Sequence, residues 1–326
     1  MIRNGNHVAI LAGGTSQERV ISLLSAEQLQ KWLAGTPYTP YIIDIQGASW
    51  TYTLPDGRCV QVDKNTFSLP LPDGAVTLDL ALISTHGTPG ENGLLQGYLE
   101  LMNIPFSSGN TFTQAVSFHK SACKRFLQGV VPLLPSLDIR RFEDLDLEAI
   151  RREIGFPLFV KPNDNGSSVG VKKVRNGNEL HQAVSETLQI SADVMLERFC
   201  PGTELSCGMV KIGNRTTVFP VAEIRSPSEF FDFKTKYDGS SQEIVPAEIP
   251  LPMSERVQQY TAAAYERLGC RGMARADFIL HDGTPYFLEI NTCPGLTAES
   301  IVPKQVRAMG RAMPDLLVDL LDSMRP

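Results

Sequence analysis

Short apolar runs alternate with helical patterns over the first third of the chain. An apolar stretch at residues 7–12 closes on two glycines, and leucines then recur at helical spacing over 23–33. A second apolar stretch, 78–84, runs through a glycine-rich turn into a helical segment at 94–102. Repeated strand–turn–helix units of this kind predict a parallel sheet whose functional loops lie at the carboxyl ends of its strands.

The pattern changes beyond residue 104 and predicts a second lobe. We expect a helix around 113–127, a charged helix around 144–153 and an apolar strand at 157–160. The strand leads into 161–170, a polar hairpin bounded by glycine. Its small residues, two hydroxyls and one lysine suit a loop that covers phosphate, although a plain hairpin turn explains the same pattern.

The last third predicts a third part that opens with a strand at 194–197 and ends in a helix around 309–324. Residues 225–246 are aromatic and polar without periodicity, which is typical of lids, binding loops or disordered segments. Hairpin-like turns at 48–74 indicate a peripheral insertion in the first part. We therefore expect an α/β protein of three parts, with the bounds 1–108, 109–193 and 194–326.

The composition narrows the function classes. The 326 residues hold 30 Lys and Arg against 36 Asp and Glu, so the net charge is −6 and no basic excess is present to bind nucleic acid. No run reaches the roughly 18 apolar residues of a membrane span, and the first residues are polar, so we expect a cytoplasmic protein. The six cysteines and five histidines lack metal-binding spacings, which argues against a disulfide framework and transition-metal chemistry.

A hairpin near the C-terminus carries the most informative local geometry. Two strands, 275–280 and 286–291, flank a turn around Asp282-Gly283. If Gly283 lies at the centre of the turn, one face is apolar and the other is polar. The predicted apolar pairs are Ala276/Ile290, Phe278/Leu288 and Leu280/Tyr286, and the predicted polar pairs are Arg275/Asn291 and Asp277/Glu289.

The polar face of this hairpin predicts a cation site. Opposed side chains on such a ribbon have Cβ atoms about 4.5–5.5 Å apart, so Asp277 and Glu289 repel unless one is protonated or a cation lies between them. Mg²⁺ accepts carboxylate oxygens, and Asn291 supplies a third oxygen. A solvent-exposed face with ordinary surface charges is the alternative. Beside this face, Arg275 and the backbone N–H groups of the turn at Gly295 suit phosphoryl transfer.

Two common nucleotide motifs are absent. No G-x-x-x-x-G-K-[ST] sequence is present, and the glycines at 13–14 lack the third glycine of the dinucleotide fingerprint. Five segments in order nevertheless resemble the D-alanine–D-alanine ligase family of ATP-grasp ligases over about residues 7–308; these segments are 13–19, 86–97, 160–170, 231–237 and 289–297. The resemblance implies an N-terminal parallel-sheet, Rossmann-like domain and two α+β lobes that clamp ATP.

The resemblance also implies a nucleotide and metal site. The residues that match the family's ATP-binding positions are Lys120, Lys161 and Ser168 at the phosphates, Glu197, Arg198 and Phe199 at adenine, Glu204 at ribose, and Lys236 at the γ-phosphate. Asp277, Glu289 and Asn291 match the ligands of two Mg²⁺ ions, for which Mn²⁺ can substitute. This set agrees with the hairpin register.

For the substrates, the resemblance implies two D-alanine molecules and an acyl-phosphate intermediate. Arg275 and the backbone of Gly295 match groups that stabilise the transferred phosphoryl group and the oxyanion. The residues that match the substrate positions are Glu18, Ser167 and Tyr237 as a hydrogen-bonded set near the first D-alanine, His86 beside it, and Ser300 at the second carboxylate. Tyr237 favours an amine over a hydroxyl acceptor. Relatives are commonly homodimers.

Other interpretations of the same residues stay open. Thr15 and Glu18 have the spacing of a capping box, which would make Glu18 a helix cap. Lys120 lies in a helical stretch where a solvated lysine is common. At the level of the whole chain, the alternatives are another ATP-grasp ligase of a carboxylate and an amine, or a nucleotide-binding module without catalysis.

Overall fold

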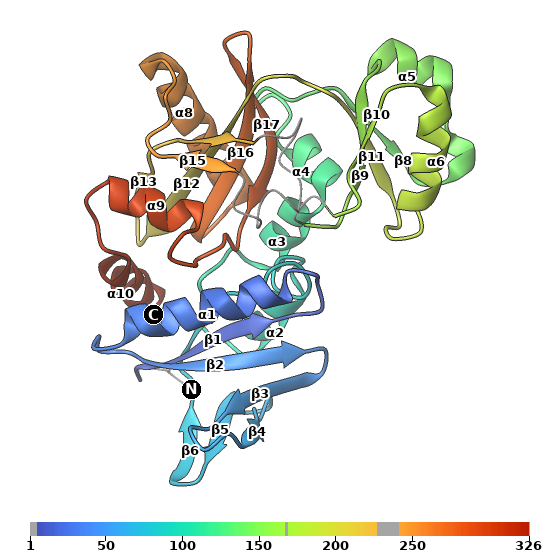
Figure 1. Cartoon of the computed structure of the whole chain (residues 1–326). Helices are drawn as coiled ribbons and strands as arrows, with labels where there is room; N and C mark the ends of the chain where they lie inside the picture. Colours follow the sequence, from blue (N-terminus) through green and yellow to red (C-terminus); the bar gives the residue numbers. More distant parts are fainter. Residues whose placement is uncertain (1–4, 167–168, 227–240, 326) are drawn as a thin grey trace.

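The computed structural model describes residues 5–166, 169–226 and 241–325, and the strands within these ranges form four sheets. Three regions are visible in Figure 1: the N-terminal sheet, the C-terminal sheet above it, and a smaller lobe to one side. This mixed α/β arrangement is the predicted fold class.

The N-terminal region contains the predicted parallel sheet. Strand β1 (His7–Gly13) pairs in parallel with both β2 (Thr39–Gln46) and β7 (Leu80–Ile83). Helices α1 (Arg19–Leu33) and α2 (Leu94–Leu101) follow β1 and β7 in sequence. Residues 8–12 of β1 are 0% exposed, because apolar side chains cover both faces of the strand.

The segment expected to be a peripheral insertion partly belongs to this sheet. Strands β3 (Ser49–Thr53) and β4 (Cys59–Gln61) are antiparallel and extend the sheet beyond β2. Only β5 (Ser68–Leu71) and β6 (Gly74–Thr77) form a separate hairpin. The prediction was therefore wrong for the first half of the segment, where Trp50 packs into the core of the sheet.

The side lobe is built on a four-stranded sheet with its own core. The strands, in the order β10-β9-β11-β8, span Lys172–Val174, Leu158–Pro162, Val194–Arg198 and Ser136–Ile139. Helices α5 (Leu147–Glu153) and α6 (Gly177–Thr187) pack on it. Strand β11, with which we expected the third part to open, lies inside this sheet and is antiparallel to both β8 and β9. Buried side chains on both of its faces explain that central position.

The C-terminal region is an antiparallel sheet flanked by helices. Its strands, in the order β15-β14-β12-β16-β17 with β13 beside β12, are β12 (Thr203–Ile212), β13 (Arg215–Val218), β14 (Ala222–Arg225), β15 (Gln242–Ile244), β16 (Gly272–His281) and β17 (Thr284–Asn291). The helices in sequence around them are α8 (Leu251–Leu268), α9 (Ile301–Ala308) and α10 (Met313–Met324).

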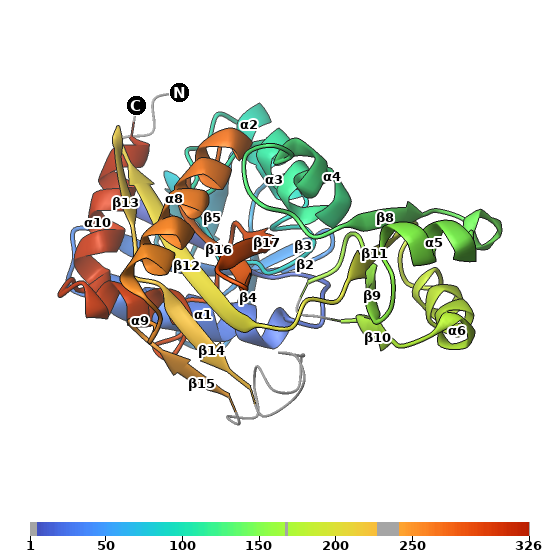
Figure 2. The same cartoon turned by 90° about the horizontal axis from the view of Figure 1, so that it is seen from above.

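The helix expected around 113–127 consists of two helices. They are α3 (Thr111–Phe118) and α4 (Lys120–Phe126), and His119 between them has an extended backbone, with φ −86° and ψ 103°. The His119 imidazole accepts a hydrogen bond from the backbone N–H of Ala122 and so caps α4. Helix α3 packs against β17 and α8 of the C-terminal region. Helix α4 contacts α8 as well, but it also contacts the side lobe, where Ser121 is hydrogen-bonded to Asn163 and Asp138 (Figure 2).

The hairpin of β16 and β17 has the predicted polar pairs and a different apolar register. Arg275 opposes Asn291, Ala276 opposes Ile290 and Asp277 opposes Glu289, but Phe278 then opposes Phe287 rather than Leu288. The turn contains two residues, Asp282 with φ 46° and Gly283 with φ 72°, so its centre falls between them. A β-bulge at Leu288 compensates for the missing residue.

The N- and C-terminal regions share one hydrophobic core. It includes Leu29 and Leu33 of α1, Leu82 of β7, and Leu317 and Leu321 of α10. This contact fixes the carboxyl end of the N-terminal sheet next to the β16–β17 hairpin. In the described residues, no helix has the length and apolar character that crossing a bilayer requires.

Candidate active site

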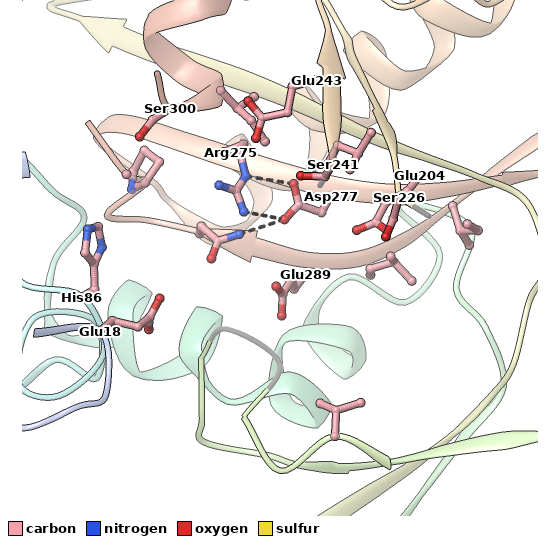
Figure 3. A pocket seen from close by; sticks show the side chains of 18 of the residues that line it. Glu18, His86, Glu204, Ser226, Ser241, Glu243, Arg275, Asp277, Glu289 and Ser300 are labelled. Atoms are coloured by element: carbon pink, nitrogen blue, oxygen red, sulfur yellow. Dashed lines mark hydrogen bonds and ion pairs between the residues drawn. The ribbon is translucent and has the colours of Figure 1, made fainter. Parts of the chain in front are cut away.

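A cavity of about 980 Å³ lies where the three regions meet. It is lined by 14 of the predicted site residues, namely Glu18, His86, Lys120, Lys161, Glu197, Arg198, Phe199, Glu204, Arg275, Asp277, Glu289, Asn291, Gly295 and Ser300. The other four, Ser167, Ser168, Lys236 and Tyr237, lie outside the described residues. In Figure 3 the hairpin residues lie between Glu18 and His86 on one side and Glu204 on the other.

Arg275 and Asp277 form a bidentate ion pair at the centre of the cavity. Arg275 Nε donates to Asp277 Oδ1 at 2.9 Å, and Nη2 donates to Oδ2 at 2.7 Å. Asn291 Nδ2 donates to the same Oδ2 at 3.0 Å, and Ser206 Oγ donates to Oδ1 at 2.6 Å. Burial alone would lower the pKa of Arg275, but the charge and hydrogen bonds of Asp277, together with the charges of Glu289 and Glu243, outweigh burial and raise the pKa. The guanidinium is therefore a fixed positive charge. Figure 3 shows its contacts with Asp277 as dashed lines.

Glu289 is held on the same face by a lysine from α4. Lys120 Nζ donates to Glu289 Oε2 at 3.0 Å and to the backbone oxygen of Asn165 at 2.9 Å. The solvated-lysine interpretation of Lys120 was therefore wrong, because its side chain is only 12% exposed. Burial lowers the pKa of Lys120, but the charge and hydrogen bond of Glu289, together with the charges of Glu197 and Glu91, outweigh burial and raise the pKa.

The oxygen donors of the hairpin fit a hard divalent cation. Asp277 and Glu289 are register partners on the face that lines the cavity, and Asn291 adds an amide oxygen. Across the described ranges, no cluster of three or more His, Cys, Asp or Glu side chains could hold a metal ion. A Mg²⁺ ion on these two carboxylates and one amide would thus complete its coordination with water and phosphate oxygens.

The bulge in β17 builds part of an apolar wall. Because the bulge adds a residue, Leu288 and Glu289 both face the cavity, while Phe287 and Ile290 are buried in the core. Ile279 lines the same wall. Across from it, the rings of Phe159 and Phe199 meet edge to face with centroids 5.8 Å apart. Such a wall suits a planar aromatic group such as a purine base.

Lys161 and Glu197 lie next to this wall, on β9 and β11. Lys161 Nζ donates to Glu197 Oε2 at 2.5 Å. The other oxygen of Glu197 accepts a hydrogen bond from Lys124, a residue that sequence reasoning missed. Burial raises the pKa of Glu197, but the two lysines outweigh burial and hold the pKa below its ordinary value.

Glu18 faces the cavity from the start of α1. It occupies the N-cap position, and its side chain makes no capping hydrogen bond, so the predicted capping box with Thr15 does not form. The glycine-rich loop of the side lobe comes close to it: a Cβ added to Gly166 would lie 2.6 Å from Glu18 Oε2. A larger residue at Gly166 would therefore displace the Glu18 carboxylate.

His86 is buried beside Glu18, and one of its two ring nitrogens makes a hydrogen bond within the protein. Its Nδ1 lies 2.9 Å from the backbone oxygen of Cys293, and a carbonyl can only accept, so Nδ1–H is the donor. The Nε2 atom is buried and has no hydrogen-bond partner among the described residues. Burial is the main cause that lowers the pKa of His86, so its imidazole is neutral and offers Nε2 as an acceptor.

Glu91 lies close to this pair and was not predicted as a site residue. Gly87 N–H donates to Glu91 Oε2 at 2.8 Å. Burial, followed by the nearby charge of Glu18, raises the pKa of Glu91 to about 8. The sequence offered one signal for it, since Glu91 belongs to the segment 86–97 that carries the family resemblance.

The turn after β17 presents small groups to the cavity. Ser300 Oγ accepts from the backbone N–H of Thr297 at 3.1 Å and lies 2.8 Å from the Thr297 hydroxyl. A Cβ added to Gly295 would lie 3.1 Å from Ser300 Oγ. Gly295 and Ser300 thus adjoin each other at the end of the cavity nearest α9.

Paired carboxylates, buried lysines and an apolar slot at the junction of three regions are the arrangement expected of an ATP-grasp ligase. Comparison with known families agrees: a model described as the D-ala D-ala ligase N-terminus matches residues 7–109, and one described as the D-ala D-ala ligase C-terminus matches residues 133–322. The chain belongs to the D-alanine–D-alanine ligase family, whose members are ATP-dependent ligases.

Individual relatives and structures support this assignment. The chain is 42% identical over 318 residues to the D-alanine–D-alanine ligase of Phocaeicola vulgatus, covering 97% of this chain and 98% of that one. A D-Ala:D-Ser ligase, VanG of Enterococcus faecalis, superposes with a TM-score of 0.88 at 27% identity and covers 98% and 100% of the two chains. The Bacillus anthracis ligase complexed with ATP gives a TM-score of 0.79 at 29% identity, with 98% and 97% covered.

Proposed function

We propose that the protein joins two D-alanine molecules to D-alanyl-D-alanine at the expense of ATP, and that the dipeptide enters peptidoglycan precursors. The observation that carries this proposal is the family match over nearly the whole chain, together with one cavity that contains the matched residues. ADP and phosphate are the other products.

The chemistry begins with the carboxylate of the first D-alanine. A carboxylate does not react with an amine directly, so one of its oxygens attacks the γ-phosphorus of ATP and ADP leaves. Lys120, Lys161 and Arg275 surround the phosphates with positive charge, and Lys236 is proposed to join them. Mg²⁺ held by the hairpin carboxylates would neutralise further phosphate charge when bound.

The resulting acyl phosphate reacts with the second D-alanine. Its amine, as the free base, attacks the acyl carbon, and the negative charge moves to the carbonyl oxygen. We assign Arg275 and the Gly295 N–H to this oxyanion. The oxyanion then re-forms the carbonyl and expels phosphate, while the nitrogen loses a proton. Ser300 is assigned to the carboxylate of the second D-alanine.

Glu18 and His86 are assigned to the ammonium group of the first D-alanine. Three hydrogens on that nitrogen need acceptors, and His86 Nε2, which has no hydrogen-bond partner among the described residues, is one such acceptor beside the cavity. The Glu18 carboxylate supplies the opposite charge. We keep Ser167 and Tyr237 as members of the same hydrogen-bonded set.

Phosphate release with D-alanine, compared with L-alanine, tests this function. We expect ATP- and Mg²⁺-dependent release with D-alanine only, and a dipeptide detected by mass spectrometry. Mn²⁺ in place of Mg²⁺ should support the reaction. ATP turnover with a different acid and amine, and none with D-alanine, would favour another ATP-grasp ligase; ATP binding without turnover would favour a non-catalytic module.

D-Serine is a second candidate acceptor, because the VanG structure is that of a D-Ala:D-Ser ligase. Competition of D-alanine, D-serine and D-lactate under one condition measures the preference. Tyr237 is expected to favour the amines, so Tyr237→Phe should raise the share of the D-lactate product. An unchanged product ratio in that variant would argue against the role of Tyr237.

We also propose a homodimer. Leu94 and Leu101 of α2 are 66% and 84% exposed, and Phe112 of the neighbouring α3 is 57% exposed. The two leucines are seven positions apart in sequence, which is about two helical turns, so they share one face of the helix. Light scattering should give twice the mass of the chain, and Leu101→Asp should shift the protein toward the monomer. A monomeric wild-type protein would contradict this proposal.

A further inference from the structure

Lys124 of α4 is a buried charge to which the mechanism gives no part. Its side chain is only 4% exposed, and its Nζ contacts one oxygen of Glu197 and, at 3.3 Å, the backbone oxygen of Leu134. Lys124 does not line the cavity. A lysine is rarely buried this deeply without a charged partner, so the contact with Glu197 accounts for its position.

Glu197 is shared between two ammonium groups. Its side chain is 1% exposed, with Lys124 on one oxygen and Lys161 on the other. Lys161 is 15% exposed and lines the cavity. The two lysines and the glutamate therefore carry a net charge of +1. Of the two ammonium groups, that of Lys161 lines the cavity.

This arrangement differs from a simple ion pair in one respect. If Lys161 and Glu197 were alone, each would neutralise the other, and the pair would offer no net charge to an anion. Lys124 forms an ion pair with one oxygen of the Glu197 carboxylate, so only the other oxygen is paired with Lys161. The pull that Glu197 exerts on Lys161 is weakened accordingly, and a phosphate oxygen can compete for the ammonium group.

We propose that Lys124 is a positioning residue that offsets the charge of Glu197, so that Lys161 remains available to the phosphates of ATP. The proposal rests on the assignment of Lys161 to those phosphates. It places α4 in the nucleotide site twice, since Lys120 faces the cavity one helical turn before Lys124.

Four variants test the proposal: Lys124→Met, Glu197→Gln, the double variant that combines them, and Lys172→Met as a matched control. Lys172 pairs with Glu186 in the side lobe, where the two side chains are 34% and 46% exposed. Binding of ATP with Mg²⁺ is measured by calorimetry, kcat by phosphate release at saturating ATP and D-alanine, and folding by thermal unfolding.

We expect Lys124→Met to raise the Kd for ATP at least about 10-fold, the scale of one charged hydrogen bond, and to change kcat by less than about 3-fold. Glu197→Gln removes the carboxylate charge that Lys124 offsets, so adding Lys124→Met to Glu197→Gln should change the Kd by less than about 3-fold, whatever Glu197→Gln itself costs at the adenine. Lys172→Met should leave the Kd unchanged. This double-mutant cycle separates a charge effect from a packing effect, because the packing lost with Lys124 is lost in both backgrounds.

An unchanged Kd in folded Lys124→Met would overturn the proposal, and so would a Lys124→Met effect that is equally large in the Glu197→Gln background. If Lys124→Met does not fold, Lys124→Gln replaces it in both backgrounds, because its amide can still donate to Glu197 but carries no charge. Wild-type protein that binds ATP but does not use D-alanine would contradict the proposed function and leave this test intact.

Discussion

The β16–β17 hairpin and the loop from His86 to Glu91 face the same cavity, but their ionisable side chains are held in opposite states. On the hairpin, each carboxylate has a cation: Arg275 for Asp277, and Lys120 for Glu289. In the loop, burial lowers the pKa of His86 and raises that of Glu91 to about 8. One region keeps its groups charged and the other keeps them neutral.

This difference matches what each region is proposed to bind. Phosphates and a divalent cation require charges that stay ionised throughout turnover, and ion pairing maintains them before the ligands arrive. An ammonium group needs acceptors, and a neutral imidazole with a lone pair is one, whereas an imidazolium is not. Breaking the first region should therefore affect turnover, and breaking the second should affect substrate binding and pH dependence.

Arg275→Ala should have the largest effect. We expect kcat to fall by about 10²–10³-fold, because a fixed charge at the reacting phosphate and oxyanion is lost. Asp277 keeps Ser206 and Asn291 as hydrogen-bond donors, so the fold should persist. Phosphate release at saturating substrates measures kcat, and Arg275→Lys serves as the comparison that keeps the charge but not the bidentate geometry. Near-normal turnover in Arg275→Ala would refute the assigned role.

Glu289→Gln should lower kcat by about 10²-fold and raise the Mg²⁺ concentration needed for half-maximal rate. The amide removes a negative charge from the proposed ligand set and leaves Lys120 without its ion pair. Rates across a Mg²⁺ titration measure both effects. Glu186→Gln is the control, because Glu186 lies in an exposed ion pair. The same Mg²⁺ dependence in both variants would argue against a metal at this hairpin.

His86→Asn should raise the KM for D-alanine about 10–100-fold, with a smaller change in kcat. The asparagine amide can still donate to the Cys293 carbonyl, so the variant removes the Nε2 acceptor alone.

The same variant should also change the pH dependence of stability. Because burial lowers the pKa of His86, the unfolded chain binds the proton more readily and acid destabilises the fold below about pH 6.5. Urea denaturation at pH 5 and pH 7 measures the free energy of unfolding. Its decrease at pH 5 should be smaller in His86→Asn than in the wild type.

Glu91→Gln should have the smallest effect, mainly on the pH dependence of stability. A pKa of about 8 in the folded state, against 4.5 as the ordinary value, means that the folded state retains a proton that the unfolded chain releases. The free energy of unfolding therefore falls as pH rises through this window, by up to about 1.4 kcal/mol per pH unit. Glutamine removes that slope. Parallel stability curves for wild type and variant between pH 5.5 and 7.5 would contradict this expectation.

Local patterns in the sequence determined several helices and strands and the polar pairs of the β16–β17 hairpin. Strand β1, helix α1 and the polar pairs of the hairpin follow from periodicity within short segments, because a strand places alternate residues on one face regardless of its neighbours. The pairing of Asp277 with Glu289 needed only a turn near Gly283, even though the turn was centred half a residue away. The two-residue turn shifts the register by one residue, and the bulge at Leu288 shifts it back. The predicted pair Asp277/Glu289 was therefore confirmed, while the predicted pair Phe278/Leu288 was wrong.

Only the tertiary structure decided which groups became buried partners. The sequence placed Lys120 and Lys124 on a helix but could not show that they meet Glu289 and Glu197. It also could not show that β11 completes the side lobe or that His86 contacts Cys293. The physical reason is that register is a local property, whereas burial and ion pairing depend on which distant segments pack together. The charges of this active site are set by that packing.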